Sequence, residues 1–252
     1  MKWNDIFCHS FKALRKQVKP ETRKQIDFML PSKPMIEACR ADDFDFFQPF
    51  IAAGNLTTEQ MHRACERYCL GKTRIGQPIF WMIDDLFQPL DAHIGENWIS
   101  NLLKQREPIL TYWKVQHCFF GLHLVNRWGL TPMLEISDFA EGSDTSDSPI
   151  SIVESESSAV ILSELLPEST WLAYATTAHL VPDLFAPLEG RRVTIYPRTD
   201  PTMSTYLFFK DLVTLTRQQY DLDLEIDTTL EDRATEDQKE RCIDILDYIS
   251  ES

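Results

Sequence analysis

The sequence predicts an α/β protein in which residues 150–252 form a parallel four-stranded sheet flanked by helices. Beyond residue 150, short β-branched runs alternate with longer helical patterns, and this alternation is typical of parallel sheets. The connections between the runs are long enough for right-handed crossovers. Several runs also break off into acidic or turn residues, as strands do at the edge where α/β proteins place their chemistry.

Residues 1–138 are predicted to be a mainly helical region with a small β element. Within residues 5–70, apolar side chains recur at helical spacing, beginning with Phe7, Phe11 and Leu14. The other elements expected here are two strands joined by a tight turn, a short helix and a buried apolar run: residues 78–84, 87–94, 97–104 and 117–125.

A capping-box pattern marks one helix start in this region. Thr57 and Gln60 have the residue types and the spacing of the box. We expect the helix to run to Leu70, with Gly71 as its C-terminal stop.

An acidic linker is predicted at residues 139–149. It has no aliphatic residue after Ala140 and ends in Pro149, a composition that favours a loop between domains. The α/β domain then spans residues 150–252. Its strands are expected at residues 150–153, 171–175, 192–196 and 222–226. Its helices are expected at residues 157–166, 180–188 (or a loop), 202–219 and 236–249.

Charge is distributed unevenly along the chain. The net charge is −14, yet residues 1–30 carry seven Lys and Arg against three acids, a local +4. Residues 221–252 carry twelve acids against three bases, a local −9. A protein that grips duplex DNA over a broad face needs a basic footprint, which the whole chain lacks. Contact with DNA or RNA would use the basic N-terminal arm, and the acidic C-terminal region would suit a protein partner.

The composition indicates a cytoplasmic protein that does not enter a membrane. No apolar run approaches the ~20 residues of a membrane helix, and the first residues contain no apolar signal segment. The six cysteines have no framework spacing and are read as free thiols. His62, Cys65 and Cys69 fall on one predicted helix face, where zinc ligation is an alternative to ordinary packing.

Carboxylates follow two of the predicted strands. Glu154 ends the first strand and Asp200 follows the third, so neighbouring parallel strands would bring both to one sheet edge. Asp244 and Asp247 lie in the last predicted helix and complete an ordered acidic set. Because Mg²⁺ prefers oxygen ligands, Glu154, Asp200 and Asp244 are the candidate metal ligands.

Basic residues near the same strands are candidates for phosphate contacts. Arg191 precedes the third predicted strand, Arg192 is its first residue, and Arg198 follows it. His179 lies in the loop after the second strand. A small-molecule nucleotide binder that uses these side chains is a third functional alternative.

The strand-end Glu followed by a later strand-end acidic motif resembles the Toprim domain of DNA primases, topoisomerases and related nucleases. Residues 151–164 resemble the first Toprim motif, in which Glu154 matches the acidic residue assigned to general acid/base or metal work. Residues 190–200 resemble the strand that leads into the Asp-x-Asp motif, and Asp244 with Asp247 resembles the acidic ending of primase-type members.

The middle of the chain is similar to primase-like proteins of bacterial mobile elements. That family often carries a zinc-binding N-terminal segment, which this chain does not show, because Cys8 has no partner two to four residues away. The segments that carry this similarity are residues 68–73, 79–84, 97–99 and 120–123.

The resemblance implies Mg²⁺-dependent phosphoryl transfer, with Glu154 as the catalytic residue, in the DNA replication or nucleic-acid metabolism of a mobile element. Arg198 departs from the pattern, because it stands where the first Asp of Asp-x-Asp is expected. A fixed cation there would repel Mg²⁺ and would instead pair with Glu154 or bind a phosphate. We therefore expect a Toprim-like protein with weakened or lost catalysis. The alternative is a non-catalytic interaction or accessory protein on the same scaffold.

Overall fold

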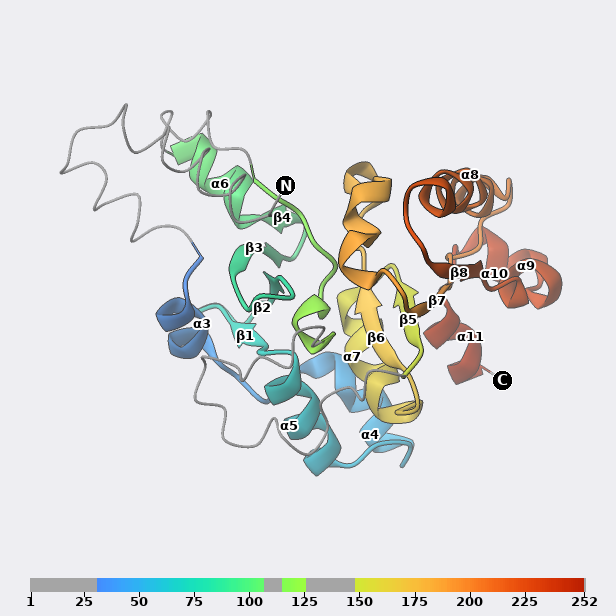
Figure 1. Cartoon of the computed structure of the whole chain (residues 1–252). Helices are drawn as coiled ribbons and strands as arrows, with labels where there is room; N and C mark the ends of the chain where they lie inside the picture. Colours follow the sequence, from blue (N-terminus) through green and yellow to red (C-terminus); the bar gives the residue numbers. More distant parts are fainter. Residues whose placement is uncertain (1–30, 107–114, 126–147, 252) are drawn as a thin grey trace, which may run out of the picture.

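The computed structural model describes residues 31–106, 115–125 and 148–251, and contains two four-stranded sheets in these ranges (Figure 1). One sheet is antiparallel, in the order β1-β2-β3-β4, and the other is parallel, in the order β6-β5-β7-β8. The predicted mixed α/β class with a parallel four-stranded sheet is confirmed.

The parallel sheet and its crossovers follow the predicted order closely. The strands are β5 (Ile150–Val153), β6 (Thr170–Ala173), β7 (Arg192–Ile195) and β8 (Asp223–Ile226). The connecting elements are α7 (Glu156–Leu165), η5 (Thr177–His179), η6 (Pro182–Leu188) and α8 (Ser204–Gln219). Each strand lies within two residues of the expected range. The central strand β5 pairs with both β6 and β7.

Strands β5 and β6 are buried on both faces and are largely apolar, whereas β7 and β8 alternate buried and more exposed residues. Successive strand side chains point to opposite faces. Val153 and Ala173 face the core that contains α7. Ile152 and Leu172 face the opposite core, to which Phe209 of α8 contributes.

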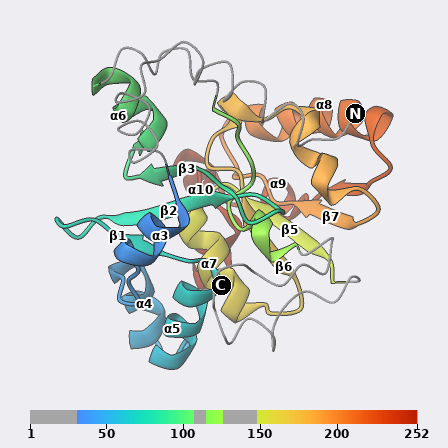
Figure 2. The same cartoon turned by 60° about the vertical axis from the view of Figure 1, so that its left-hand side comes forward.

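The antiparallel sheet occupies the other side of the molecule (Figure 2). Its strands are β1 (Gly71–Lys72), β2 (Pro78–Ile83), β3 (Pro89–Ile94) and β4 (Asn97–Trp98). The helical elements around it are α3 (Lys33–Cys39), η1 (Asp45–Phe47), α4 (Gln48–Ala52), α5 (Thr58–Arg67), α6 (Ile99–Arg106) and η3 (Leu122–Leu124). The predicted strand pair thus forms, and the predicted apolar run at 117–125 contains a β-bridge at Phe120 followed by the 3-10 helix η3.

Helix α5 begins as predicted but ends earlier. Thr57 and Gln60 form the capping box. The helix stops at Arg67, and Cys69 adopts a left-handed backbone with φ of 55°. Gly71 is therefore not a helix stop but the first residue of β1. A Cβ there would lie 3.0 Å from Nε1 of Trp81, so glycine permits the close approach of the two strands.

The single amphipathic helix expected at residues 236–249 is wrong. The C-terminal region contains α9 (Thr229–Arg233), α10 (Glu236–Glu240) and α11 (Ile245–Glu251). Cys242 adopts a left-handed backbone with φ of 53°, which ends the helical path between α10 and α11. The break turns Ile243 into the core, where it is 3% exposed.

One core joins the two sheets. It contains Phe80 of β2, Ala64 of α5 and Val160 of α7. An ion pair reinforces the contact, since the Nη2 atom of Arg67 lies 3.0 Å from Oε1 of Glu164, a carboxylate with a 3% exposed side chain. The predicted N-terminal arm and almost all of the predicted linker at 139–149 lie outside the described residues. No helix in the described ranges is long and apolar enough to cross a membrane.

Candidate functional site

Polar side chains meet at the carboxyl edge of the parallel sheet. Glu154 directly follows β5, Tyr174 directly follows β6, and Arg198 lies three residues beyond β7. The ladder continues past the strand ends, because the backbone N–H of Ala175 donates to the carbonyl of Glu154 at 2.9 Å. The Glu154 side chain is thus held at the edge by a fixed backbone.

Arg198 neutralises Glu154 directly. Its Nε atom lies 3.1 Å from Oε2 of Glu154, with side-chain exposures of 46% and 23%. Burial raises the pKa of Glu154, and the Arg198 cation opposes that shift. The hydroxyl of Tyr174 is buried beside this carboxylate without a hydrogen bond of ordinary geometry. Burial, and next the negative charge of Glu154, raise the pKa of Tyr174 well above its usual range.

The first turn of α7 connects this edge to the antiparallel sheet. Ser155 caps the helix, and Glu156 is its first residue. An oxygen of Glu156 lies 2.7 Å from Nδ1 of His93 in β3, and this hydrogen bond raises the pKa of the histidine. His93 stacks on Trp98 of β4 with ring centroids 4.9 Å apart.

Two further histidines stack beside Trp98. The rings of His117 and His179 have centroids 3.7 Å apart and an interplanar angle of 16°. Both Nδ1 atoms are buried and have no hydrogen-bond partner. Burial lowers the pKa of both side chains, that of His117 to about 4. We call the whole assembly the sheet-end cluster: Glu154, Glu156, Tyr174, Arg198, His93, Trp98, His117 and His179.

Asp200 holds the start of α8. Its carboxylate accepts hydrogen bonds from the backbone N–H groups of Thr202, Ser204 and Thr205 and from two hydroxyls. The N-cap residue Met203 offers no side-chain acceptor, so Asp200 satisfies the free amides instead. Burial alone would raise the pKa of Asp200, but these hydrogen bonds hold it well below its usual range.

Asp244 has a similar structural role at α11. Its carboxylate accepts a hydrogen bond of 2.5 Å from the hydroxyl of Ser158, and Asp244 and Asp247 exchange backbone-to-side-chain hydrogen bonds. Asp244 lies close enough to Glu154 to raise the pKa of that carboxyl.

The three predicted Mg²⁺ ligands do not fit a metal ion as they lie. Glu154 forms an ion pair with Arg198, and the carboxylate of Asp200 accepts hydrogen bonds from backbone amides of α8. The carboxylate of Asp244 accepts a hydrogen bond from Ser158. Within the described ranges, no three His, Cys, Asp or Glu side chains are placed to hold a metal ion. The shared ion predicted for Glu154 and Asp200 therefore has no geometric support.

The predicted phosphate-binding residues are separated along β7. The Nη2 atom of Arg191 donates to the carbonyl of Ser148 at 2.7 Å. Arg192 opens β7 opposite Asp223 at the amino end of the sheet. Arg198 lies beyond the carboxyl end of the same strand, so the three arginines do not converge on one phosphate.

The structure also does not support a zinc site formed by His62, Cys65 and Cys69. Cys65 and Cys69 are buried, and burial raises the pKa of each thiol to about 12. His62 is exposed on the helix surface.

Several members of the sheet-end cluster were not predicted. Tyr174 lies inside the strand predicted at residues 171–175, and it becomes a strand-end side chain because β6 ends at Ala173. His93 and Glu156 are 63 positions apart and come from different sheets, so no local pattern pairs them. His117 was expected to be buried in an apolar run, and it is only partly buried.

A family model described as a domain of unknown function (DUF6371) matches residues 140–199. The matched segment contains β5, α7, β6 and β7 together with Glu154 and Arg198, and it stops before α8. Neither a curated protein nor a solved structure matches the chain.

Proposed function

We propose that the chain is a Toprim-like protein, related to the primase-like proteins of bacterial mobile elements, in which metal-dependent catalysis has been lost. The scaffold then acts as a non-catalytic accessory protein in nucleic-acid metabolism. The ion pair between Arg198 and Glu154 carries this proposal, because it places a permanent cation on the side chain that would serve as the catalytic carboxylate.

The fates of the other acidic residues support the same proposal. Asp200 and Asp244 stabilise the starts of α8 and α11 and are not free for an incoming ion. Arg198 therefore stands in place of the first Asp of the Asp-x-Asp motif and neutralises Glu154. Asp200 and Asp244, the other two candidate ligands, stabilise helix starts.

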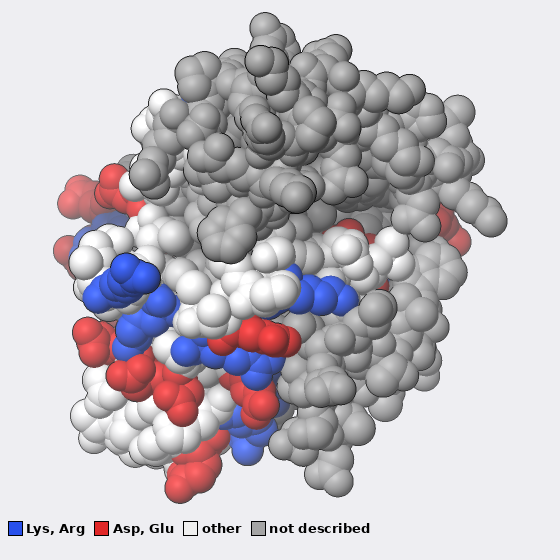
Figure 3. All heavy atoms as spheres, turned by 90° about the vertical axis from the view of Figure 1, so that its left-hand side faces the viewer, with Lys and Arg blue, Asp and Glu red and all other residues white. Residues whose placement is uncertain are grey.

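Direct catalysis on a duplex has little electrostatic support. The side of the molecule shown in Figure 3 has acidic and basic side chains interspersed, with no broad basic area among the residues drawn in colour. The net charge of −14 adds long-range repulsion of phosphates. An accessory role that works through protein contacts suits this charge distribution better.

The experiment that tests this proposal is the variant Arg198→Asp. The substitution changes the local charge by two units beside Glu154. A unit charge at ~4 Å and an effective dielectric of ~20 is worth about 4 kcal/mol, a value reduced here by exposure. We expect Mg²⁺ affinity, measured by calorimetry, to rise at least about tenfold.

Arg192→Asp is the matched control, because it makes the same change at the opposite end of β7. It should leave Mg²⁺ affinity unchanged. Adding Glu154→Gln to Arg198→Asp should remove the gain. Primer synthesis or strand cleavage by the wild-type protein that depends on Mg²⁺ and on Glu154 would overturn the proposal.

A further inference from the structure

A pair of stacked histidines joins two segments that lie far apart in the sequence. His117 precedes the β-bridge at Phe120, and His179 is the last residue of η5, in the connection between β6 and β7. The two rings have centroids 3.7 Å apart and an interplanar angle of 16°. Trp98 of the antiparallel sheet lies beside both rings, with its centroid 5.7 Å from that of His117 and 5.4 Å from that of His179. We call the contact between His117 and His179 the histidine stack.

The ring nitrogens of the histidine stack suit uncharged imidazoles. Each Nδ1 atom is buried and has no hydrogen-bond partner within the described part of the chain. A neutral imidazole carries a single N–H, which Nε2 can hold, and Nδ1 then keeps a bare lone pair. Protonation adds an N–H at Nδ1, and a buried donor without an acceptor costs free energy. A proton on either ring therefore weakens the contact, and protons on both rings add the repulsion of like charges.

Charged groups from the neighbouring elements do not compensate for this cost. Burial is the largest cause that lowers the pKa of His117, and the ring of His179 and the cation of Lys104 in α6 lower it further. Burial also lowers the pKa of His179, and the carboxylate of Asp91 in β3 opposes this shift without reversing it. Both histidines are thus held in the uncharged form while the stack is closed.

The third histidine of the sheet-end cluster responds to acid in the opposite direction. Nδ1 of His93 lies 2.7 Å from an oxygen of Glu156, and this hydrogen bond raises the pKa of His93. His93 stacks on Trp98, on which the histidine stack also borders. Acidification therefore favours the contact of His93, and the histidine stack is the part of the cluster that acid weakens.

We propose that the histidine stack is an acid-sensitive latch between the segment at residues 115–118 and the parallel sheet. The latch is closed at neutral pH and opens when its imidazoles take up protons. Opening separates residues 115–118 from η5. It also loosens the bridge between Phe120 and Ala173, because Phe120 lies only three residues after His117.

Proton linkage gives the direction and the pH window of the response. A histidine that is uncharged in the closed form and titrates freely in the open form binds more protons when open, so acid favours opening. The pKa of His117 is about 4 in the closed form and near 6.5 when it is exposed, so the latch opens as the pH falls from 6.5 toward 4. Between pH 7 and pH 5 this group alone favours opening by at least about tenfold.

Hydrogen–deuterium exchange of the full chain at pH 7 and pH 5 tests the latch, with rates corrected for the intrinsic pH dependence of amide exchange. Fragments that cover residues 115–121 and 174–180 should exchange at least about tenfold faster at pH 5. Helix α8 is the internal reference and should change little. The double variant His117→Phe/His179→Phe keeps two rings that can stack but cannot titrate, and it should be equally protected at both pH values.

His62→Phe is the matched control, because it replaces an exposed histidine of α5 outside the stack and should open as the wild type does. An NMR titration of the histidine Cε1–H signals needs no substitution, and two of them should titrate below pH 6.5 together with the rise in exchange. The proposal is overturned by unchanged exchange at pH 5, by equally faster exchange in the double variant, or by faster exchange throughout the chain, including α8. Titration of every histidine near pH 6.5 would also overturn it.

Discussion

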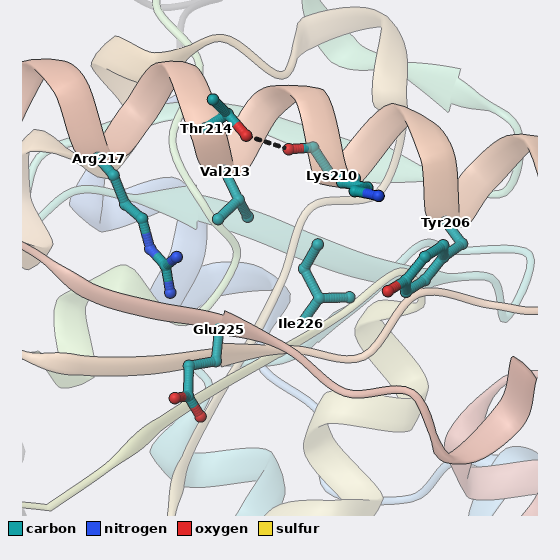
Figure 4. A pocket seen from close by; sticks show the side chains of 7 residues that line it. All are labelled: Tyr206, Lys210, Val213, Thr214, Arg217, Glu225 and Ile226. Carbon is teal, nitrogen blue, oxygen red and sulfur yellow. Dashed lines mark hydrogen bonds between the residues drawn. The ribbon is translucent and has the colours of Figure 1, made fainter. Parts of the chain in front are cut away.

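The sheet-end cluster differs in its charge pairing from a groove between α8 and β8 of the same parallel sheet, whose lining includes Lys210 and Arg217 (Figure 4). In the cluster, Arg198 and Glu154 pair with each other, and His93 pairs with Glu156. In the groove, Lys210 and Arg217 have no acidic partner among the described residues. Charges that are satisfied within the protein contribute to stability, whereas unsatisfied charges at a surface are available for ligands. The cluster therefore has the properties of a structural site, whereas the groove leaves the charges of Lys210 and Arg217 at the surface.

Acidification should give the largest loss of stability. It tests whether the sheet-end cluster requires uncharged histidines. The pKa of His117 is about 4 when folded and near 6.5 when unfolded, so the unfolded chain binds more protons between these values. Stability should thus fall as the pH drops from 6.5 toward 4, by about 2 to 3 kcal/mol for this group. Urea unfolding at pH 7 and at pH 4.5 measures it.

His117→Phe is the control for this prediction, because phenylalanine can stack on His179 and does not titrate. The variant should lose less stability than the wild type over the same pH interval. His93 works in the other direction, since its raised pKa contributes stability below pH 6.5 that is lost as pH rises through the folded pKa. Equal pH dependence in the two proteins would show that the stack is open to water.

Asp200→Ala should have the next largest effect on stability, because Asp200 caps the start of α8. This helix forms one wall of the groove. The change removes the acceptor for three backbone N–H groups at the start of α8. Loss of such a cap costs about 1 to 2 kcal/mol in the free energy of unfolding. Asp211→Ala in the exposed middle of α8 is the control and should be nearly neutral. Equal stability in the two variants would contradict the capping role.

Arg198→Ala should lower the free energy of unfolding by about 1 kcal/mol, since the broken pair is partly exposed. The half-buried Glu154 then lacks its cation, and its pKa should rise further. Chemical denaturation and NMR titration of the carboxyl measure the two effects. Arg192→Ala should change neither quantity, and an unshifted Glu154 pKa in Arg198→Ala would mean that the pair does not form in solution.

Lys210→Ala and Arg217→Ala should have the smallest effects on stability. Because neither cation has an ionic partner among the described residues, each change should stay within about 0.5 kcal/mol. Thermal or urea unfolding of the two variants checks this. A loss well above 1 kcal/mol would show that these two side chains stabilise the fold. The groove and the sheet-end cluster would then not differ in how their charges are used.

The parallel sheet was predictable because its signals are local. Segments such as 150–153 and 192–196 are short β-branched runs bounded by polar residues, and the first of them is buried along its whole length, which favours that composition. The break between α10 and α11 had no such signal. It depends on Cys242 in a left-handed backbone, a conformation for which cysteine has no preference and which tertiary packing of Ile243 imposes.

The candidate site was predictable only where strand order determines it. Glu154 and Arg198 follow adjacent strands, so their meeting at one edge is a consequence of parallel pairing. The use of Asp200 to cap α8 is a local feature that the search for metal ligands overlooked. The contact between His93 and Glu156 joins two sheets, and such contacts depend on how the sheets pack together rather than on any local pattern.

One outer strand of the parallel sheet, β6, is closed by a contact within the chain. Phe120 and Ala173 exchange backbone hydrogen bonds of 2.8 and 3.1 Å, which satisfies the outward backbone groups of β6 at Ala173. A strand from a second copy of the chain therefore finds no free hydrogen-bonding groups at this position. Because unpaired strand edges are templates for aggregation, the short bridge at Phe120 removes one such template from this sheet.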